Sequence, residues 1–481
     1  MQKNESYLII DIGTGNVRVA QTSTDGHVIN IATDTVNYIR DSKYKDALYF
    51  EPDELWEQII NLIKKVIGEV KGRHIKAITV SSQREGIVLL DRKGNSILGL
   101  PNHDHRGRDW EVEMKNKAEV YRLTGRYPSS LFSAFKLVGV RKVHPELYSM
   151  LDKVMSISDW AQFKLSGVMG YEDSQASETL LYDVKEGTWS DKLCSLFDLD
   201  MDILPRIHQS GTILGKVLPE YASTLNIPPD AVVIVGGADT QLAVMSTMPD
   251  TGDVIIVAGT TTPIVKVVDQ YVIDEKQRTW TNRHTEPNNF ILEANAGVTG
   301  LNYQRLKEIF YPNESYDLIE EELQKIPPSL CIASLGSLIA EEENPLVKGG
   351  FIFNVPVPHD LTRASFVWAT LWDIACCVNE NYKTLCSVSG NEPEYVWACG
   401  GGIQSPTLRQ FIANLINKKV RFRMGFRQSS VVGGAFICNQ ALDDGQFQTD
   451  DIGEINPITD EDLKEQFASW QKVRTGLKHI F

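Results

Sequence analysis

One pattern occurs twice in this chain: an apolar strand, a bend of glycine and threonine, and a second apolar strand. The first copy is YLIIDIGTGNVRVA at residues 7–20, and the second, a weaker match, is DVIIVAGTTTPIVKVV at residues 253–268. A chain of 481 residues is too long for one hydrophobic core. We therefore predict two domains, each beginning with one copy, whose bends face a common cleft. The expected boundary near residue 245 gives domains 1–245 and 246–481.

Strand and helix patterns alternate along both halves of the chain. In the first half, helical periodicity at residues 54–70 precedes strand-like segments at 74–82 and 86–91. In the second half, helical stretches cover 364–388 and 406–417, on either side of a short strand that ends in three glycines. This alternation predicts an α/β fold.

The amino-acid composition limits which binding partners and which cellular location we expect. Hydrophobic residues make up 42% and charged residues 23% of the chain, and the net charge is −15. This acidity disfavours nucleic acid and anionic membranes as partners. No apolar run is long enough for a membrane span, and the N-terminus has no signal-peptide pattern. The seven cysteines are scattered without a C-x-x-C motif, which favours reduced thiols and a cytoplasmic location.

The first bend has the chemistry of a phosphate site. Backbone N–H groups of Gly13, Thr14 and Gly15 can converge on phosphate oxygens, and Arg18 can add a charge-assisted hydrogen bond. Asp11 would repel phosphate, but it can hold Mg²⁺ through water. The segment is not a P-loop, because no GxxxxGK[ST] occurs here. A tight hairpin with a surface salt bridge remains the alternative.

The second bend and a later glycine cluster extend this site. Gly259, Thr260 and Thr261 could grip the other end of a triphosphate, although a plain hairpin turn gives the same pattern. Gly400–Gly402 lie between a strand and a helix, where glycines let a flat heterocycle approach the backbone. An adenine site is one interpretation, and an ordinary tight turn is the other.

An acid at the end of a buried strand is the candidate catalytic group. Asp239 follows AVVIVGGA, and two glycines allow close approach of a ligand. Phosphoryl transfer to an alcohol needs a group that orients the hydroxyl and accepts its proton. The alternative for Asp239 is the N-cap of the helix that follows.

Two polar segments in the first half are candidates for substrate contacts. Arg84 and Glu85 can donate to and accept from adjacent hydroxyls of a sugar, or they can form a buried ion pair. In PNHDHRG, Asp104 and Arg106 are substrate contacts or salt-bridge partners. Metal binding at residues 103–105 is disfavoured, because neighbouring side chains point in different directions.

These segments together resemble the FGGY family of carbohydrate kinases, from residue 7 to about residue 440. DIGTGNVR and AGTTTP are similar to its two phosphate motifs, and SQASETLLYD, residues 174–183, to a structural motif near the end of the first domain. GGADTQLA resembles the segment with the family's catalytic aspartate, which implies Asp239. SSQREGIVLLDRKG resembles the substrate region, which implies Arg84 and Glu85. GGGIQSPTLRQFIANLINKKV resembles the adenosine motif, which implies Gly401, Gly402 and Ser405.

The resemblance implies two actin-like, ribonuclease-H-like ATPase domains that flank a central cleft. It also implies ATP and Mg²⁺ as cofactors, a small sugar or polyol as the substrate and a homodimer as the family expectation. Within the family, QREGIVL, PNHDHRG, ISDWAQFKLSG and GTILGKV are most similar to autoinducer-2 kinases. A xylulose-, gluconate- or glycerol-type kinase is the alternative.

The chain also departs from the family pattern. Asn414 stands where the adenosine motif usually has Asp, and Gln428-Ser429-Ser430 stand where a Glu commonly precedes the last Gly-Ala helix. Two further functions stay open from the sequence. One is another actin-like ATPase, such as a chaperone or filament protein, and the other is a catalytically inactive sugar sensor.

Overall fold

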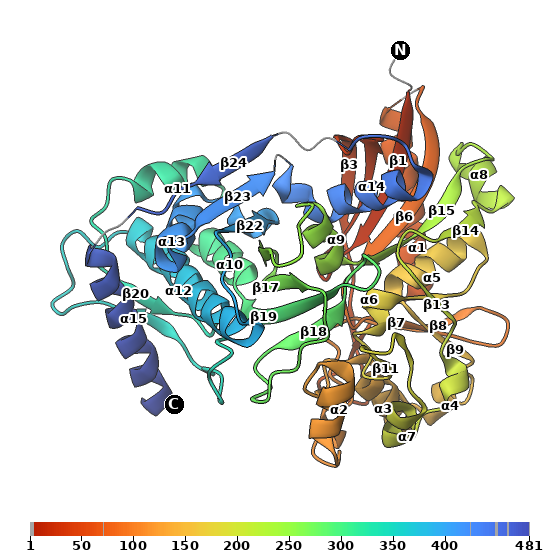
Figure 1. The fold of residues 1–481 in the computed structure, drawn as a ribbon, viewed down its shortest axis with the longest axis horizontal. Coiled ribbons are helices and arrows are strands. Elements are labelled where there is room, and N and C mark those ends of the chain that lie inside the picture. The colour runs from red at the N-terminus through yellow and green to blue at the C-terminus, as the bar shows by residue number, and fades with distance from the viewer. Residues whose placement is uncertain (1–3, 71, 424, 448–450, 459–460, 481) are drawn as a thin grey trace.

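Two large mixed sheets, one in each half of the chain, organise the protein (Figure 1). The computed structural model describes the chain except for residues 1–3, 71, 424, 448–450, 459–460 and 481. Within the described residues, no helix has both the length and the apolar character needed to cross a lipid bilayer. All seven cysteines are free thiols with buried side chains.

The first sheet has the strand order β14-β15-β6-β1-β2-β3. Strands β1, β2 and β3 form an antiparallel meander, while β6 and β15 run parallel to β1. Helix α1 packs on β2 and β3, and α5 on β6 and β15. The bounds are β1 (Glu5–Ile12), β2 (Asn16–Ser23), β3 (Val28–Thr35), β6 (His74–Ser82), β14 (Ile213–Lys216), β15 (Val232–Ala238), α1 (Pro52–Glu69) and α5 (Ile157–Ser166).

The second sheet repeats this topology with the order β18-β19-β17-β16-β22-β23-β24. Strands β16, β17 and β19 form the antiparallel meander, and β22 and β23 are the parallel strands. The predicted α/β fold with two similar halves is therefore confirmed. The bounds are β16 (Val254–Val257), β17 (Thr261–Val268), β18 (Trp280–Arg283), β19 (Phe290–Val298), β22 (Tyr395–Cys399), β23 (Lys419–Arg423), β24 (Ile452–Ile455), α12 (Arg363–Ser389) and α13 (Pro406–Ile416).

Local sequence explains these elements. β1 is apolar along most of its length because helices cover both faces of its sheet. Helix α1 begins at Pro52. Proline is tolerated there because an N–H in the first turn of a helix has no acceptor within the helix. The helix buries an apolar stripe that includes Ile59 and Val66. Helix α13 begins after Ser405, whose hydroxyl accepts from the Leu408 N–H at 3.1 Å.

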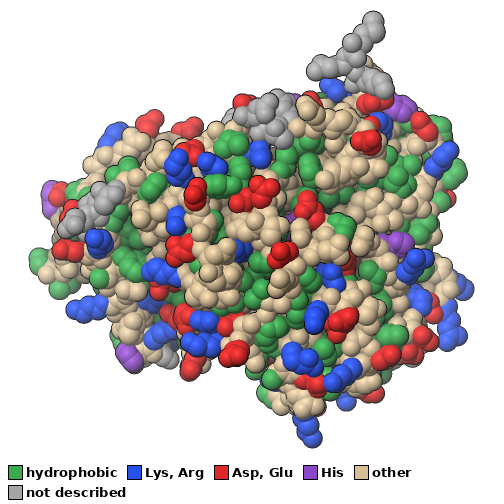
Figure 2. Space-filling model, in the orientation of Figure 1, with side chains coloured by type: hydrophobic (Ala, Val, Ile, Leu, Met, Phe, Trp, Pro, Cys, Tyr) green, Lys and Arg blue, Asp and Glu red, His purple; other side chains and the backbone are tan. Residues whose placement is uncertain are grey.

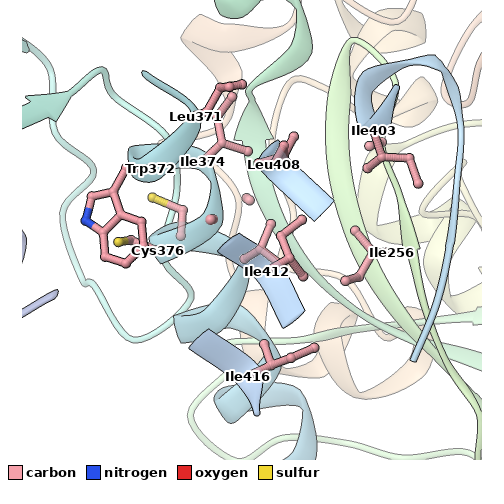
Figure 3. Packing of buried hydrophobic residues seen from close by; sticks show 14 of the residues in the cluster. Ile256, Leu371, Trp372, Ile374, Cys376, Ile403, Leu408, Ile412 and Ile416 are labelled. Atoms are coloured by element: carbon pink, nitrogen blue, oxygen red, sulfur yellow. The ribbon is translucent and has the colours of Figure 1, made fainter. Parts of the chain in front are cut away.

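The core of the second half lies between α12, α13 and the sheet (Figure 3). Ile412 and Leu408 of α13 point toward Ile256 of β16 and toward α12. On α12, Trp372 stacks on Trp368 with ring centroids 5.5 Å apart. This packing fixes the strand ends that carry the second bend and the glycine cluster.

Helix α14 (Ser429–Leu442) follows β23 of the second sheet along the chain but packs on the first sheet (Figure 1). It lies against β1, β6 and α9 (Asp239–Met245). Close approach requires glycine, because a Cβ at Gly433 would lie 1.8 Å from the Leu242 carbonyl oxygen. The beginning of α14, which carries Ser430, is thereby brought to the Asp11 end of β1.

Smaller elements complete both halves. In the first half they are β4 (Ile39–Arg40), β5 (Leu48–Tyr49), β7 (Ile87–Leu90), β8 (Ser96–Leu100), η1 (Arg108–Trp110), α2 (Lys117–Thr124), α3 (Ser133–Val143), α4 (Pro145–Tyr148), β9 (Lys153–Ser156), β10 (Tyr171–Glu172), α6 (Asp173–Ala176), β11 (Tyr182–Asp183), β12 (Thr188–Trp189), α7 (Asp191–Phe197), η2 (Met201–Ile203), β13 (Ile207–His208) and α8 (Pro219–Leu225). In the second half they are α10 (Gly300–Phe310), α11 (Tyr316–Leu323), β20 (Ile332–Ser334), β21 (Gly350–Ile352), η3 (Gly401–Ile403), η4 (Phe426–Gln428) and α15 (Glu461–Ile480).

Candidate active site

The first bend connects β1 and β2 tightly, and side chains from other segments hydrogen-bond to it. The Gly13 N–H donates to the Asn16 carbonyl at 2.9 Å. The Tyr38 hydroxyl donates to the Thr14 carbonyl at 2.7 Å, and the Asn102 amide donates to the Thr14 hydroxyl at 2.9 Å. Gly15 is exposed, and a Cβ there would meet no atom within 4 Å. The outer side of the bend is therefore open to a ligand.

Asp11 sits beneath this bend in a ring of hydrogen-bond donors. It is 1% exposed and accepts from Ser81 of β6 at 3.0 Å and from Ser430 of α14 at 2.8 Å. Arg18 forms an ion pair with Asp11 and donates to the Gln428 side chain at 3.1 Å. The Arg18 side chain is still 30% exposed, so it can also reach a ligand at the bend.

The second bend and the glycine cluster form one assembly. The Ala258 carbonyl, just before the bend, accepts from the Gly402 N–H at 2.7 Å. Gly400 has φ 94°, and a Cβ there would lie 2.3 Å from the same carbonyl oxygen, so only glycine fits. Gly300, the first residue of α10, lies close against the bend. A Cβ added at Gly300 would lie only 2.1 Å from the Gly259 carbonyl oxygen. Gly259 and its neighbour in the bend are exposed.

A narrow cavity lies against this assembly, and it includes residues that the sequence analysis missed. Thr299, Gly300 and Tyr303 line it together with Gly402 and apolar side chains of α12 and α13. The buried Tyr303 hydroxyl has no hydrogen-bond partner. The only sequence signal was a glycine before a helical pattern in VTGLNY, which is weak by itself.

Ser405 has a structural partner in addition to its predicted ligand role. It is 3% exposed, caps α13 and donates to the Glu320 carboxylate of α11. Glu320 also accepts from the Thr407 hydroxyl at 2.6 Å. A carboxylate therefore occupies the N-terminus of α13, and contact of Ser405 with a nucleotide remains a proposal.

Asp239 lies at the start of α9, where β15 ends. The N-cap of α9 is Ala238, so the alternative role of Asp239 as N-cap is wrong. Asp239 is partly exposed, and one of its oxygens accepts from the Thr240 N–H at 2.7 Å. Burial raises the pKa of Asp239 to about 6, Arg84 opposes that shift and Asp11 adds to it. These mutual influences put Asp11, Arg84 and Asp239 in one electrostatic neighbourhood.

Arg84 joins the two halves of the protein. Its guanidinium donates to both oxygens of Glu293 in β19, at 2.5 and 3.1 Å. Arg84 is 8% and Glu293 1% exposed. The predicted ion pair of Arg84 with Glu85 is much looser, with 4.0 Å between the charged atoms. Sequence analysis missed Glu293, although an acid inside the apolar strand FILEANAGV was a possible signal.

Glu85 is held close to Arg84 by its backbone. It has φ 61°, an unusual conformation for this residue type, and its carbonyl accepts from the Ser133 hydroxyl at 3.1 Å. Burial raises the pKa of the Glu85 carboxyl, against the opposing effect of Arg84. Burial also lowers the pKa of nearby Lys136 to about 8, while Glu85 acts to raise it.

Asp104 is buried beneath the surface. It is 0% exposed and accepts from the Leu48 N–H and from Arg106 Nε, both at 2.8 Å. Of the two roles considered for Asp104 and Arg106, the geometry supports the salt bridge. His103 packs edge-on against Tyr38, and no cluster of three or more metal-binding side chains occurs among the described residues.

Comparison with known proteins identifies the family. The model described as the N-terminal domain of the FGGY family of carbohydrate kinases matches residues 6–246, and the C-terminal domain model matches residues 255–442. YoaC of Bacillus subtilis, provisionally named a sugar kinase, is 45% identical over 98% of this chain and 96% of its own length. The autoinducer-2 kinase of Salmonella paratyphi B is 24% identical over 99% and 94% of the two chains.

Solved structures share the fold over almost the full length. Plasmodium falciparum glycerol kinase with ADP superposes with a TM-score of 0.86 at 20% identity and covers 98% of both chains. Xylulose kinase from Lactobacillus acidophilus gives 0.83 at 20% identity and covers 99% of this chain and 97% of its own. With both family models matched in order, the chain belongs to the FGGY family of carbohydrate kinases, phosphotransferases that use ATP and act on a hydroxyl group.

Proposed function

We propose that the protein transfers the γ-phosphoryl group of ATP to a hydroxyl of a small sugar, polyol or sugar-like molecule, with Asp239 as the general base. The observation that supports this most is the setting of Asp239. It is partly exposed among buried neighbours, it shares its electrostatic environment with Arg84 and Asp11, and its pKa is raised to about 6. A carboxylate of that pKa is ionised at pH 7 and still basic enough to accept a proton.

We propose that the two bends bind the triphosphate of ATP from opposite sides. Gly13–Gly15 and Gly259–Thr261 each expose backbone where phosphate oxygens can approach. Arg18 contributes the positive charge on the first side. Gly401 and Gly402, next to the second bend, are proposed to contact the adenine ring. Binding both substrates between the halves would orient the acceptor hydroxyl and exclude water.

The Asp11 environment fits a water-mediated magnesium site. Asp11 Oδ1 accepts one hydrogen bond, from Ser81, and so retains a lone pair for a bound water. Oδ2 is engaged by Ser430 and Arg18. Mg²⁺ there would neutralise charge on the phosphates, with most of its ligands supplied by water and nucleotide.

The proposed base is tested by replacing its carboxylate with an amide. Asp239→Asn should lower the rate of sugar-dependent ADP release by about a hundredfold or more, because general-base catalysis contributes that much. ATP affinity, measured by calorimetry, should stay within about twofold. Asp250→Asn, an exposed aspartate beyond α9, is the matched control and should behave as wild type. Undiminished transfer by Asp239→Asn would remove the assignment.

The acceptor substrate would be identified by testing a panel of candidate compounds for phosphoryl transfer. Relatives are named for autoinducer-2, xylulose and glycerol, so these three compounds are the first candidates. Transfer to none of them, with intact ATP binding, would favour the alternative of an inactive sugar sensor. We also propose a cytoplasmic location, consistent with the buried free thiols, and a homodimer, which sedimentation would test.

A further inference from the structure

The end of β15, which leads into Asp239, is held differently on its two sides. On the inner side, β6 stays paired with β15 up to Ala238, which lies opposite Ser82. On the outer side, the pairing with β14 ends at Ile234, and two further hydrogen bonds reach only the Val235 backbone. The backbone N–H of the buried Ala238 therefore needs a partner from another element.

The one-turn helix α6 supplies that partner, and it packs against β15 (Figure 1). The Ser174 hydroxyl accepts from the Ala238 N–H at 3.0 Å. The same hydroxyl donates to Glu172 Oε2 at 2.6 Å, and the Gln175 N–H donates to that oxygen at 2.9 Å. Glu172 thereby orients the hydroxyl that holds the strand one residue before Asp239. We call Glu172, Ser174 and Gln175 the α6 cluster, and each is at most 1% exposed.

The α6 cluster also holds the end of β6. The Gln175 amide donates to the Ser82 carbonyl at 3.2 Å and to the Ser82 hydroxyl at 2.9 Å. Ser82 is the last residue of β6 and lies two positions before Arg84. Because one short helix is bonded to both strand ends, it fixes the backbone of Asp239 relative to that of Arg84.

Glu172 serves this cluster as a hydrogen-bond acceptor. Burial raises the pKa of its carboxyl to about 8, and the neighbouring Asp159 adds to the rise. The carboxyl is therefore mostly protonated at pH 7. Its Oε1 is buried without a hydrogen-bond partner, whereas Oε2 accepts both hydrogen bonds of the cluster. An uncharged amide in this place would still offer the acceptor oxygen that Ser174 and Gln175 need.

We propose that Ser174 is a positioning residue for the proposed base, and that Glu172 fixes the Ser174 hydroxyl for this task. Ser174 acts through the backbone: it holds Ala238, and with it the Asp239 carboxylate, in reach of the acceptor hydroxyl. The inference rests on the proposed function, because it takes Asp239 as the base.

The first test removes the Ser174 hydroxyl. Ser174→Ala leaves the buried Ala238 N–H without its acceptor, so the strand end can shift. Because misplacement of a reacting group by about 1 Å can cost a hundredfold in rate, kcat for acceptor-dependent ADP release should fall about ten- to a hundredfold. The KM for ATP should stay within about twofold, since neither phosphate bend is altered.

Ser166→Ala is the matched control. The Ser166 hydroxyl also accepts from one backbone N–H, that of Val168 at 3.1 Å, and donates to one oxygen, the Gln162 carbonyl at 2.7 Å. It lies at the end of α5 and contacts neither strand end through these bonds. Ser166→Ala should lower the melting temperature to a similar extent and leave kcat unchanged.

A pair of variants at Glu172 tests the acceptor role. Glu172→Ala removes the oxygen that orients Ser174, and kcat should fall as in Ser174→Ala. The conservative Glu172→Gln keeps an acceptor oxygen and should recover most of that loss at pH 7. Equal losses for Glu172→Gln and Glu172→Ala would show that Glu172 does not act by accepting these hydrogen bonds.

A double variant separates positioning from general support of the fold. In the Asp239→Asn background, Ser174→Ala should leave the residual kcat unchanged, because the carboxylate that Ser174 positions is already gone. A merely structural role would lower the residual kcat as much as it lowers the wild-type kcat, in step with the melting temperature.

The outcomes distinguish this inference from the proposed function. A wild-type kcat for Ser174→Ala, or an equal loss in the Asp239→Asn background, overturns the positioning role while kinase activity stands. If Ser174→Ala does not fold, the comparison of Glu172→Ala with Glu172→Gln decides in the same way. Undiminished transfer by Asp239→Asn alone contradicts the proposed base instead.

Discussion

At the scale of single residues, the neighbourhood of Asp11 shows how this chain differs from its family pattern. Gln428 and Ser430, in the segment where the family resemblance leads us to expect a Glu, bind Arg18 and Asp11 directly. Gln428 is neutral, so it orients Arg18 without cancelling its charge. In the proposed phosphate site, Arg18 would therefore keep more positive charge for phosphate than it would beside a second acid.

This arrangement predicts the effect of restoring an acid. Gln428→Glu should raise the KM for ATP about tenfold, because a second carboxylate would compete for Arg18. The KM for the sugar should change little. Gln440→Glu, at the exposed far end of α14, adds the same charge and should leave both values unaltered. An unchanged KM for ATP in Gln428→Glu would show that Arg18 does not contact the nucleotide.

The raised pKa of Asp239 predicts the acid limb of the pH profile. Because the base must be ionised, kcat/KM should be constant above pH 7 and should fall tenfold per unit below about pH 6. Initial rates between pH 5 and 8 in buffers of constant ionic strength would measure it. A profile that is flat down to pH 5 would exclude Asp239 as the titrating base.

The same shift predicts a change in stability. A carboxyl whose pKa is higher in the folded than in the unfolded state favours folding when protonated, so this contribution is lost as pH rises through about 6. At pH 7, Asp239→Asn should therefore raise the melting temperature, and at pH 4 the difference should shrink. A lower melting temperature for Asp239→Asn at pH 7 would contradict the burial of this charge.

At the scale of elements, α14 links the second half of the chain to the Asp11 region of the first sheet. Its contact with α9 depends on Gly433, where a Cβ would lie 1.8 Å from the Leu242 carbonyl oxygen. Moving α14 outward would also move Ser430 away from Asp11. We therefore expect stability and the proposed nucleotide binding to be coupled through this helix.

Gly433→Ala should accordingly lower the free energy of unfolding by about 1–3 kcal/mol and weaken ATP binding together. Urea denaturation and calorimetry would measure the two effects. Gly476→Ala in α15 is the matched control, since a Cβ there meets nothing within 4 Å and helix propensity favours alanine. Loss of stability with unchanged ATP affinity would show that α14 does not position the nucleotide site.

The sequence predicted the elements whose cause is local and missed the contacts whose cause is distant. The repeated strand and bend pattern, α12 and α13 follow from periodicity and glycine positions within short windows. Glu293 meets a partner 209 positions away, so no local pattern could show their contact. The burial of Asp104 likewise depends on Leu48, which the separate strand β5 supplies.

At the scale of the whole molecule, the Arg84–Glu293 pair ties the two sheets together beside the proposed base. Elsewhere, acidic and basic side chains are interspersed over the face in Figure 2, without a single large basic area there. The buried pair is therefore the interaction through which substrate binding and the relative position of the halves should be linked.

Removing one member of this pair should be costly. Glu293→Ala leaves the Arg84 guanidinium buried without its carboxylate, and we expect a loss of about 3–5 kcal/mol in the free energy of unfolding. Glu293→Gln, which keeps one hydrogen-bond acceptor, should lose less. Urea denaturation would compare the two, and a change below about 1 kcal/mol for Glu293→Ala would mean that the halves are held by other contacts.

Phosphoryl transfer to an added acceptor is the activity on which the proposed roles of all these residues depend. The most direct measurement is the rate of ADP release by the wild-type protein with ATP and Mg²⁺, in the presence and absence of the best acceptor in the panel. We predict at least a hundredfold stimulation by the acceptor, with one phosphorylated product per ADP. Equal ADP release with and without every acceptor would contradict a kinase and indicate an ATPase of the same fold.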